Sequence, residues 1–148
     1  MIKEDFKTFN IHNFSPSEVE ATGANINDVK IKTIVSLQSF REFVRRKVLL
    51  IKNGITTGIH KATEHQEGLA VDCYLDPLDG SISIHDIFKG ALTAGFHGIG
   101  IYWNGAIYSF HFDHRSRFAF WVGVKDNSKG ITEWQWFSLL QDPTKIQL

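Results

Sequence analysis

An Asn-Gly pair, Asn104–Gly105, separates two apolar runs, Gly98–Trp103 and Ala106–His114. Asn-Gly between such runs is the strongest short-range signal for a β-hairpin, because both residues tolerate the positive φ that a tight turn needs. A third apolar run, Phe118–Val124, follows after a short polar stretch. We therefore expect these three runs to form an antiparallel meander within a mostly antiparallel sheet.

Helical signals precede and interrupt these strands. Ser15-Pro16-Ser17-Glu18 is a capping box with proline at the first helical position, which predicts a short helix over residues 16–21. Apolar residues recur at helical spacing from Lys30 to Arg46, and Ser83 caps a further amphipathic helix that should end at Gly95. The remaining expected elements are strands in "KVLLIKNG" and Leu69–Leu75, and a closing helix in "EWQWFSLL".

These elements fit one domain over residues 1–148. The length is ordinary for a single domain, and 43% hydrophobic residues are enough for a core. No repeat, low-complexity segment or linker divides the chain. The sequence thus predicts an α+β fold on a mostly antiparallel sheet.

Charge and cysteine content exclude several kinds of site. Lys+Arg and Asp+Glu both number 16, so the attraction for polyanions that nucleic-acid binding requires is missing. A single cysteine, Cys73, excludes an internal disulfide framework and an all-thiolate zinc site. Any bound metal would have to be held by histidine and carboxylate.

The chain shows neither a secretory signal nor an apolar run long enough to span a bilayer. We therefore expect a protein made in a cytoplasm without a signal peptide of its own, and no membrane as partner.

Strand alternation predicts which side chains share a face of the sheet. Asp72 alternates away from Val71 and Cys73, and His111 and Asp113 alternate away from the phenylalanines of their strand. With His65 they make a set of two histidines and one carboxylate, which in zinc enzymes leaves a fourth position for water. Spacing alone leaves open whether this set binds zinc or consists of surface and hydrogen-bonded histidines.

Two motifs carry a resemblance to a known family. Residues 63–72, "TEHQEGLAVD", resemble the S/T-x-H-x-x-G-x-A-x-D signature of the D-alanyl-D-alanine carboxypeptidase family of zinc peptidases, whose His and Asp bind the metal. The segment "GIGIYWNGAIYSFHFDHR" resembles the family's G-I-G-x-Y segment and its h-H-x-D-x-R element, where h is apolar and the histidine is the third ligand. The stretch "HNFSPSEV" is similar to the start of phage and prophage members, and the resemblance runs from about Asn13 to Trp121.

The resemblance implies a LAS/hedgehog-like fold, in which an antiparallel sheet floors a zinc site and helices pack on the other side. It implies Zn²⁺ as cofactor with His65, Asp72 and His111 as ligands. Family members hydrolyse stem peptides of bacterial peptidoglycan, as D,D-carboxypeptidases or as L-alanyl-D-amino-acid endopeptidases, and phage members are endolysins or virion-borne enzymes. The expected partners are therefore a peptidoglycan peptide and other virion proteins, and the expected place of action is the cell wall or periplasm after synthesis in a bacterial host.

The chain departs from the family pattern at two places. The family's S-G-Y-R element, whose arginine helps bind substrate, corresponds here to Asn53-Gly54-Ile55-Thr56. Lys52 is a candidate replacement cation, although lysine lacks the planar fork of arginine. The other candidate substrate contacts are Thr63, His60 and Arg115.

The general base is the second departure. Tyr108 occupies the position where several relatives have an acid. Asp113 is the leading candidate for the catalytic carboxylate, and the alternative is that it orients a histidine ligand or pairs with Arg115. Glu64 and Glu67 are lesser candidates.

Three functions remain open at this point. The first is a zinc peptidase of peptidoglycan peptides, and the second is a catalytically silent relative that binds zinc in a virion or at the wall. The third is an α+β interaction domain without a metal. We expect the four tryptophans to pack in the core and on the surface rather than to form a sugar-stacking platform: Trp103, Trp121, Trp134 and Trp136.

Overall fold

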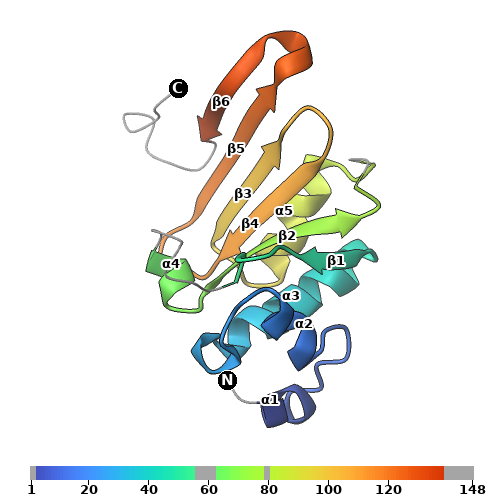
Figure 1. The fold of residues 1–148 in the computed structure, drawn as a ribbon, viewed down its shortest axis with the longest axis vertical. Coiled ribbons are helices and arrows are strands. Elements are labelled where there is room, and N and C mark those ends of the chain that lie inside the picture. The colour runs from blue at the N-terminus through green and yellow to red at the C-terminus, as the bar shows by residue number, and fades with distance from the viewer. Residues whose placement is uncertain (1–2, 56–62, 79–80, 139–148) are drawn as a thin grey trace.

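The computed structural model describes residues 3–55, 63–78 and 81–138 (Figure 1). The helices are α1 (Lys3–Thr8), α2 (Pro16–Ala21), the 3₁₀ helix η1 (Ile26–Asp28), α3 (Ile31–Val44), α4 (Thr63–Gln66), α5 (Ile84–Thr93) and the 3₁₀ helix η2 (Asn127–Lys129). The strands are β1 (Lys47–Leu50), β2 (Ala70–Asp76), β3 (Gly98–Trp103), β4 (Tyr108–Asp113), β5 (Ala119–Asp126) and β6 (Ile131–Ser138). The predicted α+β class is confirmed.

The strands form one six-stranded sheet in the order β1-β2-β4-β3-β5-β6. All neighbouring strands are antiparallel except β3 and β5, which are parallel. The sheet is therefore mixed, with antiparallel pairing dominant, as expected.

The predicted hairpin of β3 and β4 is confirmed, but the three-strand meander is wrong. The outer edge of β4 is occupied by β2, with Ala70 opposite Asp113. The chain therefore passes from β4 to the free edge of β3, where β5 pairs in parallel with Gly98 opposite Ala119. Competition for one strand edge, which local sequence does not report, explains the difference.

The predicted closing helix is also wrong, because the described part of that segment is strand β6. The 3₁₀ helix η2 and Gly130, with φ of 74°, reverse the chain after β5. β6 then pairs antiparallel to β5, with Trp136 opposite Gly123. Aromatic residues favour strands, and pairing along β5 satisfies backbone groups that a helix would otherwise satisfy internally.

The helix caps agree with the sequence. Ser15 and Glu18 form the capping box of α2, and the Ser83 side chain accepts a hydrogen bond from the Asp86 amide at the start of α5. No helix of the described ranges has both the length and the apolar character of a membrane crossing.

The apolar core lies between the sheet and helices α3 and α5, which cover one face (Figure 1). Phe40 of α3 packs edge-to-face against Phe112 of β4, with ring centroids 4.7 Å apart. Val71, Cys73 and Phe112 are fully buried on this face, as alternation predicts. Asp72 and His111 consequently lie on the opposite face, away from the helices.

Candidate metal centre

His65 is positioned by α4, a single helical turn that directly precedes β2. Gly68 ends this turn with φ of 71°, and a Cβ there would clash with the Asp28 carbonyl. The Gly68 carbonyl accepts hydrogen bonds from the Lys30 amide and the Thr33 hydroxyl, which tie the turn to α3. The motif glycine thus has a physical role: it lets the turn approach the helical layer and directs His65, which is 2% exposed, over the sheet.

Asp72 and His111 are brought together by strand register. They are directly opposite one another on β2 and β4. The backbone of Asp72 is also held by the segment after β1, because its amide donates to the Gly54 carbonyl and its carbonyl accepts from the Ile51 amide. Two residues 39 positions apart therefore face each other at a distance set by the sheet.

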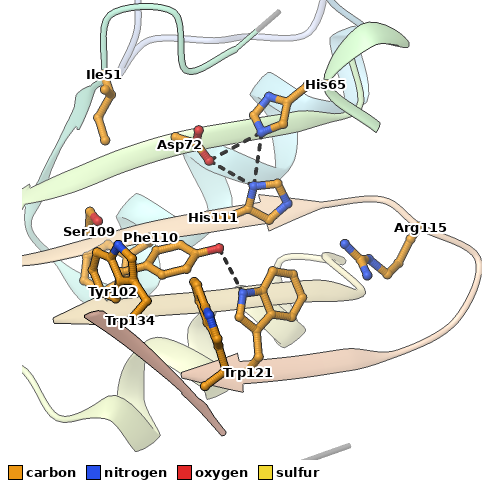
Figure 2. A pocket seen from close by; sticks show the side chains of 11 residues that line it. Ile51, His65, Asp72, Tyr102, Ser109, Phe110, His111, Arg115, Trp121 and Trp134 are labelled. Atoms are coloured by element: carbon orange, nitrogen blue, oxygen red, sulfur yellow. Dashed lines mark hydrogen bonds and ion pairs between the residues drawn. The ribbon is translucent and has the colours of Figure 1, made fainter. Parts of the chain in front are cut away.

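The three side chains converge on one point (Figure 2). His111 Nδ1 lies 2.9 Å from Asp72 Oδ1 and 3.1 Å from His65 Nε2, and His65 Nε2 lies 3.5 Å from Asp72 Oδ1. A tetrahedral ion with bonds of ~2.0–2.2 Å separates its ligand atoms by about 3.3–3.6 Å. Small movements would therefore let these residues hold a metal ion.

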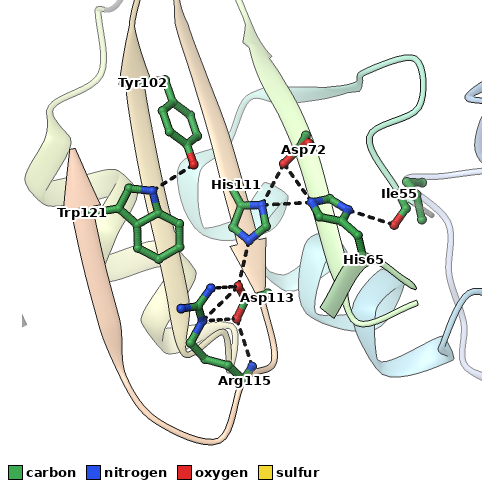
Figure 3. A network of polar contacts seen from close by, with 8 residues as sticks. All are labelled: Ile55, His65, Asp72, Tyr102, His111, Asp113, Arg115 and Trp121. Atoms are coloured by element: carbon green, nitrogen blue, oxygen red, sulfur yellow. Dashed lines mark hydrogen bonds and ion pairs between the residues drawn. The ribbon is translucent and has the colours of Figure 1, made fainter. Parts of the chain in front are cut away.

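The outer hydrogen bonds of both histidines direct their lone pairs toward this point. His65 Nδ1 lies 3.3 Å from the Ile55 carbonyl, which can only accept, so this nitrogen carries the proton. His111 Nε2 lies 2.8 Å from Asp113 Oδ2 and donates to that carboxylate (Figure 3). Held in this way, His65 and His111 direct Nε2 and Nδ1, respectively, toward the Asp72 carboxylate, so that a cation or a shared proton can lie between the three groups. This group of three side chains could hold a metal ion.

Asp113 lies behind His111 rather than beside the convergence point. Its side chain is fully buried, and Arg115 donates to it from its backbone amide, Nε and Nη2, the last at 2.6 Å. Both carboxylate oxygens are thus engaged by His111 and Arg115. The sequence left open whether Asp113 acts as a base or orients a histidine ligand and pairs with Arg115. This geometry matches the second role.

The pKa values follow from these contacts. Burial alone would raise the pKa of Asp72, but hydrogen bonds from His111 and His65 outweigh it and lower that pKa to about 2. Burial would lower the pKa of His111, but hydrogen bonds to Asp113 and Asp72 raise it to about 9. Despite burial, the His111 and Arg115 hydrogen bonds hold the pKa of Asp113 well below its usual range. Without a metal, a proton on His111 therefore provides the positive charge.

We expect the free energy of unfolding of the metal-free protein to be greatest between about pH 4 and pH 6.5 and to fall on either side of this interval. His111 stabilises the fold fully below its unfolded pKa of 6.5, and this contribution is lost as the pH rises through about 9. Asp72 stabilises the fold fully above its unfolded pKa of 3.8, and this contribution is lost as the pH falls through about 2. Urea unfolding with a chelator present should show a decrease on the order of 2 kcal/mol between pH 6.5 and 9. A flat profile over that interval would contradict the proposed state of His111.

The convergence point lies on the wall of a cavity of about 490 Å³ (Figure 2). The volume is typical of small-molecule sites, which span ~300–1,000 Å³. The residues lining the cavity come mainly from the face of the sheet opposite the helices: Ile51, His65, Asp72, Tyr102, Ser109, Phe110, His111, Arg115, Trp121, Trp134 and Trp136.

The candidate substrate contacts are distributed unevenly around this cavity. Arg115 lines it, with its guanidinium 4.9 Å from the centre of the Trp121 ring. Lys52 and Thr63 are exposed and do not line it. His60 and Thr56 lie outside the described residues. Asp113 is separated from the cavity by His111 and Arg115.

Sequence reasoning missed the aromatic wall of the cavity. Tyr102, Trp121, Trp134 and Trp136 line it, although the tryptophans were expected only to pack in the core and on the surface. The W-x-W spacing of Trp134 and Trp136 was a usable signal, because a strand places alternate residues on one face. The signal was hidden by the expectation of a helix.

Tyr102 adds a neutral hydrogen-bonding group to this wall. Its hydroxyl oxygen accepts a 2.9 Å hydrogen bond from Trp121 Nε1. Burial raises the pKa of Tyr102 to about 12, so the phenol keeps its proton at neutral pH and can donate it in a hydrogen bond.

No family model, curated protein or solved structure matches this chain. The interpretation of the site therefore depends on the geometry of its own residues and on the motif resemblance.

Proposed function

We propose that the protein is a zinc-dependent peptidase that hydrolyses stem peptides of peptidoglycan. The observation that carries this proposal is the convergence of three lone-pair donors, from His65, Asp72 and His111, at the wall of a cavity. Two histidines and one carboxylate are a ligand set typical of catalytic zinc, which keeps a further position for water. When bound, zinc supplies a Lewis acid that polarises a carbonyl and activates water near neutral pH.

The substrate class is supported by the two motifs and their spacing. The residues that the motifs identify as ligands, 46 positions apart in the case of His65 and His111, are the residues that meet in the fold. A D,D-carboxypeptidase and an L-alanyl-D-amino-acid endopeptidase fit this resemblance equally. We place the activity at the bacterial cell wall or in a virion, as a wall-degrading protein of a phage or prophage.

The other residues of the cavity have separate roles in this proposal. Asp113 holds His111 in the tautomer that leaves Nδ1 free to bind a cation, and Arg115 holds Asp113. Tyr102 donates a hydrogen bond to the scissile carbonyl as negative charge develops on its oxygen, which compensates for the missing arginine. Arg115 lies close enough to the cavity to attract the carboxylate of a peptide.

The second candidate function is a catalytically silent zinc-binding protein of a virion or the wall. The observation that favours it is the engagement of both Asp113 oxygens, which removes the leading candidate for a general base. Asp72 is the one carboxylate among the described residues that line the cavity. Within the described lining of the cavity, a peptidase would therefore depend on Asp72 as the carboxylate that moves the proton.

Digestion of purified peptidoglycan separates the two functions. We expect zinc-loaded protein to release new amino termini, and mass spectrometry of the fragments to identify one cleaved bond in the stem peptide. Protein depleted of metal by a chelator is the control and should release none until zinc is restored. Zinc-loaded protein that leaves several stem-peptide types intact would establish the silent alternative.

A further inference from the structure

Two of the candidate metal donors and two of the tryptophans, Trp121 and Trp136, belong to two neighbouring rows across the sheet. Asp72, His111, Gly100 and Trp121 are successive partners on β2, β4, β3 and β5. In the next row, Tyr102 is the partner of Gly123, and Gly123 is the partner of Trp136. One face of the sheet therefore changes from metal ligands to aromatic rings over the width of a few strands.

Glycines make room for the indole rings on this face. A Cβ on Gly100 would lie 2.6 Å from the Trp121 ring, and a Cβ on Gly123 would lie 2.6 Å from the Trp136 ring. Such contacts require the rings to lie close against the backbone of the neighbouring strand. Trp121 also lies beneath the Arg115 guanidinium and 5.5 Å from the His111 ring, so it links the metal donors to the rest of the wall.

Trp134, Trp136 and Tyr102 form what we call the aromatic shelf. Trp134 and Trp136 stack with centroids 5.6 Å apart, and Tyr102 meets both rings edge-on. The two tryptophans are still 38% and 39% exposed, and both line the cavity. The shelf thus combines ordered rings with ring surface that remains open to a ligand.

The chemistry of the shelf selects a neutral ligand with one apolar face. Among the described residues that line the cavity, the charged and titratable groups other than Tyr102 are His65, Asp72, His111 and Arg115. These are the three candidate metal donors and Arg115, and none of them belongs to the shelf. An apolar side chain of a bound peptide would favour an enclosed pocket, whereas the two tryptophan rings of the shelf are more than one-third exposed. A pyranose ring fits an open shelf, because its C–H face packs on the indole while its hydroxyls stay in water.

We propose that the aromatic shelf binds the N-acetylhexosamine rings of the glycan strand of peptidoglycan. The stem peptide attached to that strand would then reach the metal centre. This inference deepens the proposed function and rests on it for the identity of the glycan. It also replaces the expectation that the tryptophans only pack.

The test uses the zinc-supplemented full chain and the tetramer of β-1,4-linked N-acetylglucosamine, which contains no stem peptide. We expect the tetramer to shift the indole N–H resonances of Trp134 and Trp136 in a saturable way. Trp103 is an internal reference, because it alternates to the other face from Tyr102 on β3. No saturable shift with folded protein, or a shift confined to Trp103, would overturn the inference.

Substitution of the shelf is the second measurement. Trp136→Ala should weaken tetramer binding at least tenfold, whereas Phe137→Ala should leave it within twofold. Phe137 is the matched control, because it is 43% exposed on the same strand but alternates to the opposite face. Equal affinity in wild type and Trp136→Ala would refute the shelf as the binding site. Circular dichroism confirms folding, and Trp134→Phe provides a milder variant with an expected partial loss.

Hydrolysis distinguishes failure of this inference from failure of the proposed function. We expect wild type to prefer a disaccharide-linked stem peptide over the bare peptide through a lower KM, and Trp136→Ala to reduce this preference at least tenfold. Cleavage of both peptides with equal KM would contradict glycan binding by the shelf and would still support the peptidase activity. Tetramer binding without any hydrolysis would retain the shelf and refute the peptidase.

Discussion

If the proposed function holds, replacement of Asp72 by alanine removes zinc binding and peptide hydrolysis together. Asp72 provides the one carboxylate of the donor set, and its oxygen lies within 3.5 Å of the facing nitrogens of both histidines. Loss of its negative charge leaves two neutral imidazoles, which bind a divalent cation far more weakly. We expect zinc affinity to fall more than ~100-fold, given that even outer-shell partners contribute 10–100-fold. Hydrolysis of stem peptides should fall by at least ~10³-fold.

The measurement is zinc content after gel filtration, together with hydrolysis at a fixed zinc concentration. Asp76→Ala is the matched control, since Asp76 is the exposed last residue of the same strand and lies opposite Lys47, away from the centre. This variant should bind zinc as the wild type does. Stoichiometric zinc in Asp72→Ala would show that the metal is held elsewhere, and would remove the basis of the proposed function.

Among the substitutions of the site residues, replacement of Asp113 by alanine is expected to lower the free energy of unfolding most. Asp113 is fully buried between His111 and Arg115, and its carboxylate accepts four hydrogen bonds or charged contacts from Arg115 alone. Removing the carboxylate leaves the buried His111 and the partly exposed Arg115 without their acceptor, which costs on the order of 2 kcal/mol. Urea unfolding of the metal-free protein at about pH 6 measures the loss. A change below about 1 kcal/mol would contradict the ion pair.

Asp113→Asn tests whether this residue positions His111 or moves protons itself. The amide oxygen can still accept the hydrogen bond from His111 Nε2, but an amide cannot act as a base. If Asp113 positions the ligand, the variant should bind zinc ~10–100-fold more weakly and recover most activity at saturating zinc. Normal zinc affinity with lost activity would instead identify Asp113 as the general base.

Local signals predicted the elements that depend on neighbouring residues. The turn at Asn104–Gly105 specified the β3–β4 hairpin, because turn geometry is decided within a few residues. The Ser15–Glu18 box specified the start of α2 for the same reason. Strand alternation correctly separated Asp72 and His111 from the buried apolar residues of their strands, because a two-residue period holds wherever a strand pairs.

Predictions that depended on distant partners were wrong or incomplete. The edge at which β5 pairs is decided by β2, which already occupies β4. Strand β6 was mistaken for a helix because a short aromatic run suits either form until a partner strand is present. The same error hid Trp134 and Trp136, whose common face exists only in a strand.

The sequence by itself determined the composition of the candidate site: two histidines and an aspartate in recognisable motifs, in a chain with too few cysteines for a thiolate centre. Only the tertiary structure decided how these groups relate. The register of β2 against β4 brings Asp72 to His111, the turn at Gly68 brings His65 above them, and Asp113 is held behind His111 by Arg115. Distance and orientation between residues 39 and 46 positions apart are properties of packing, because only the folded sheet fixes them.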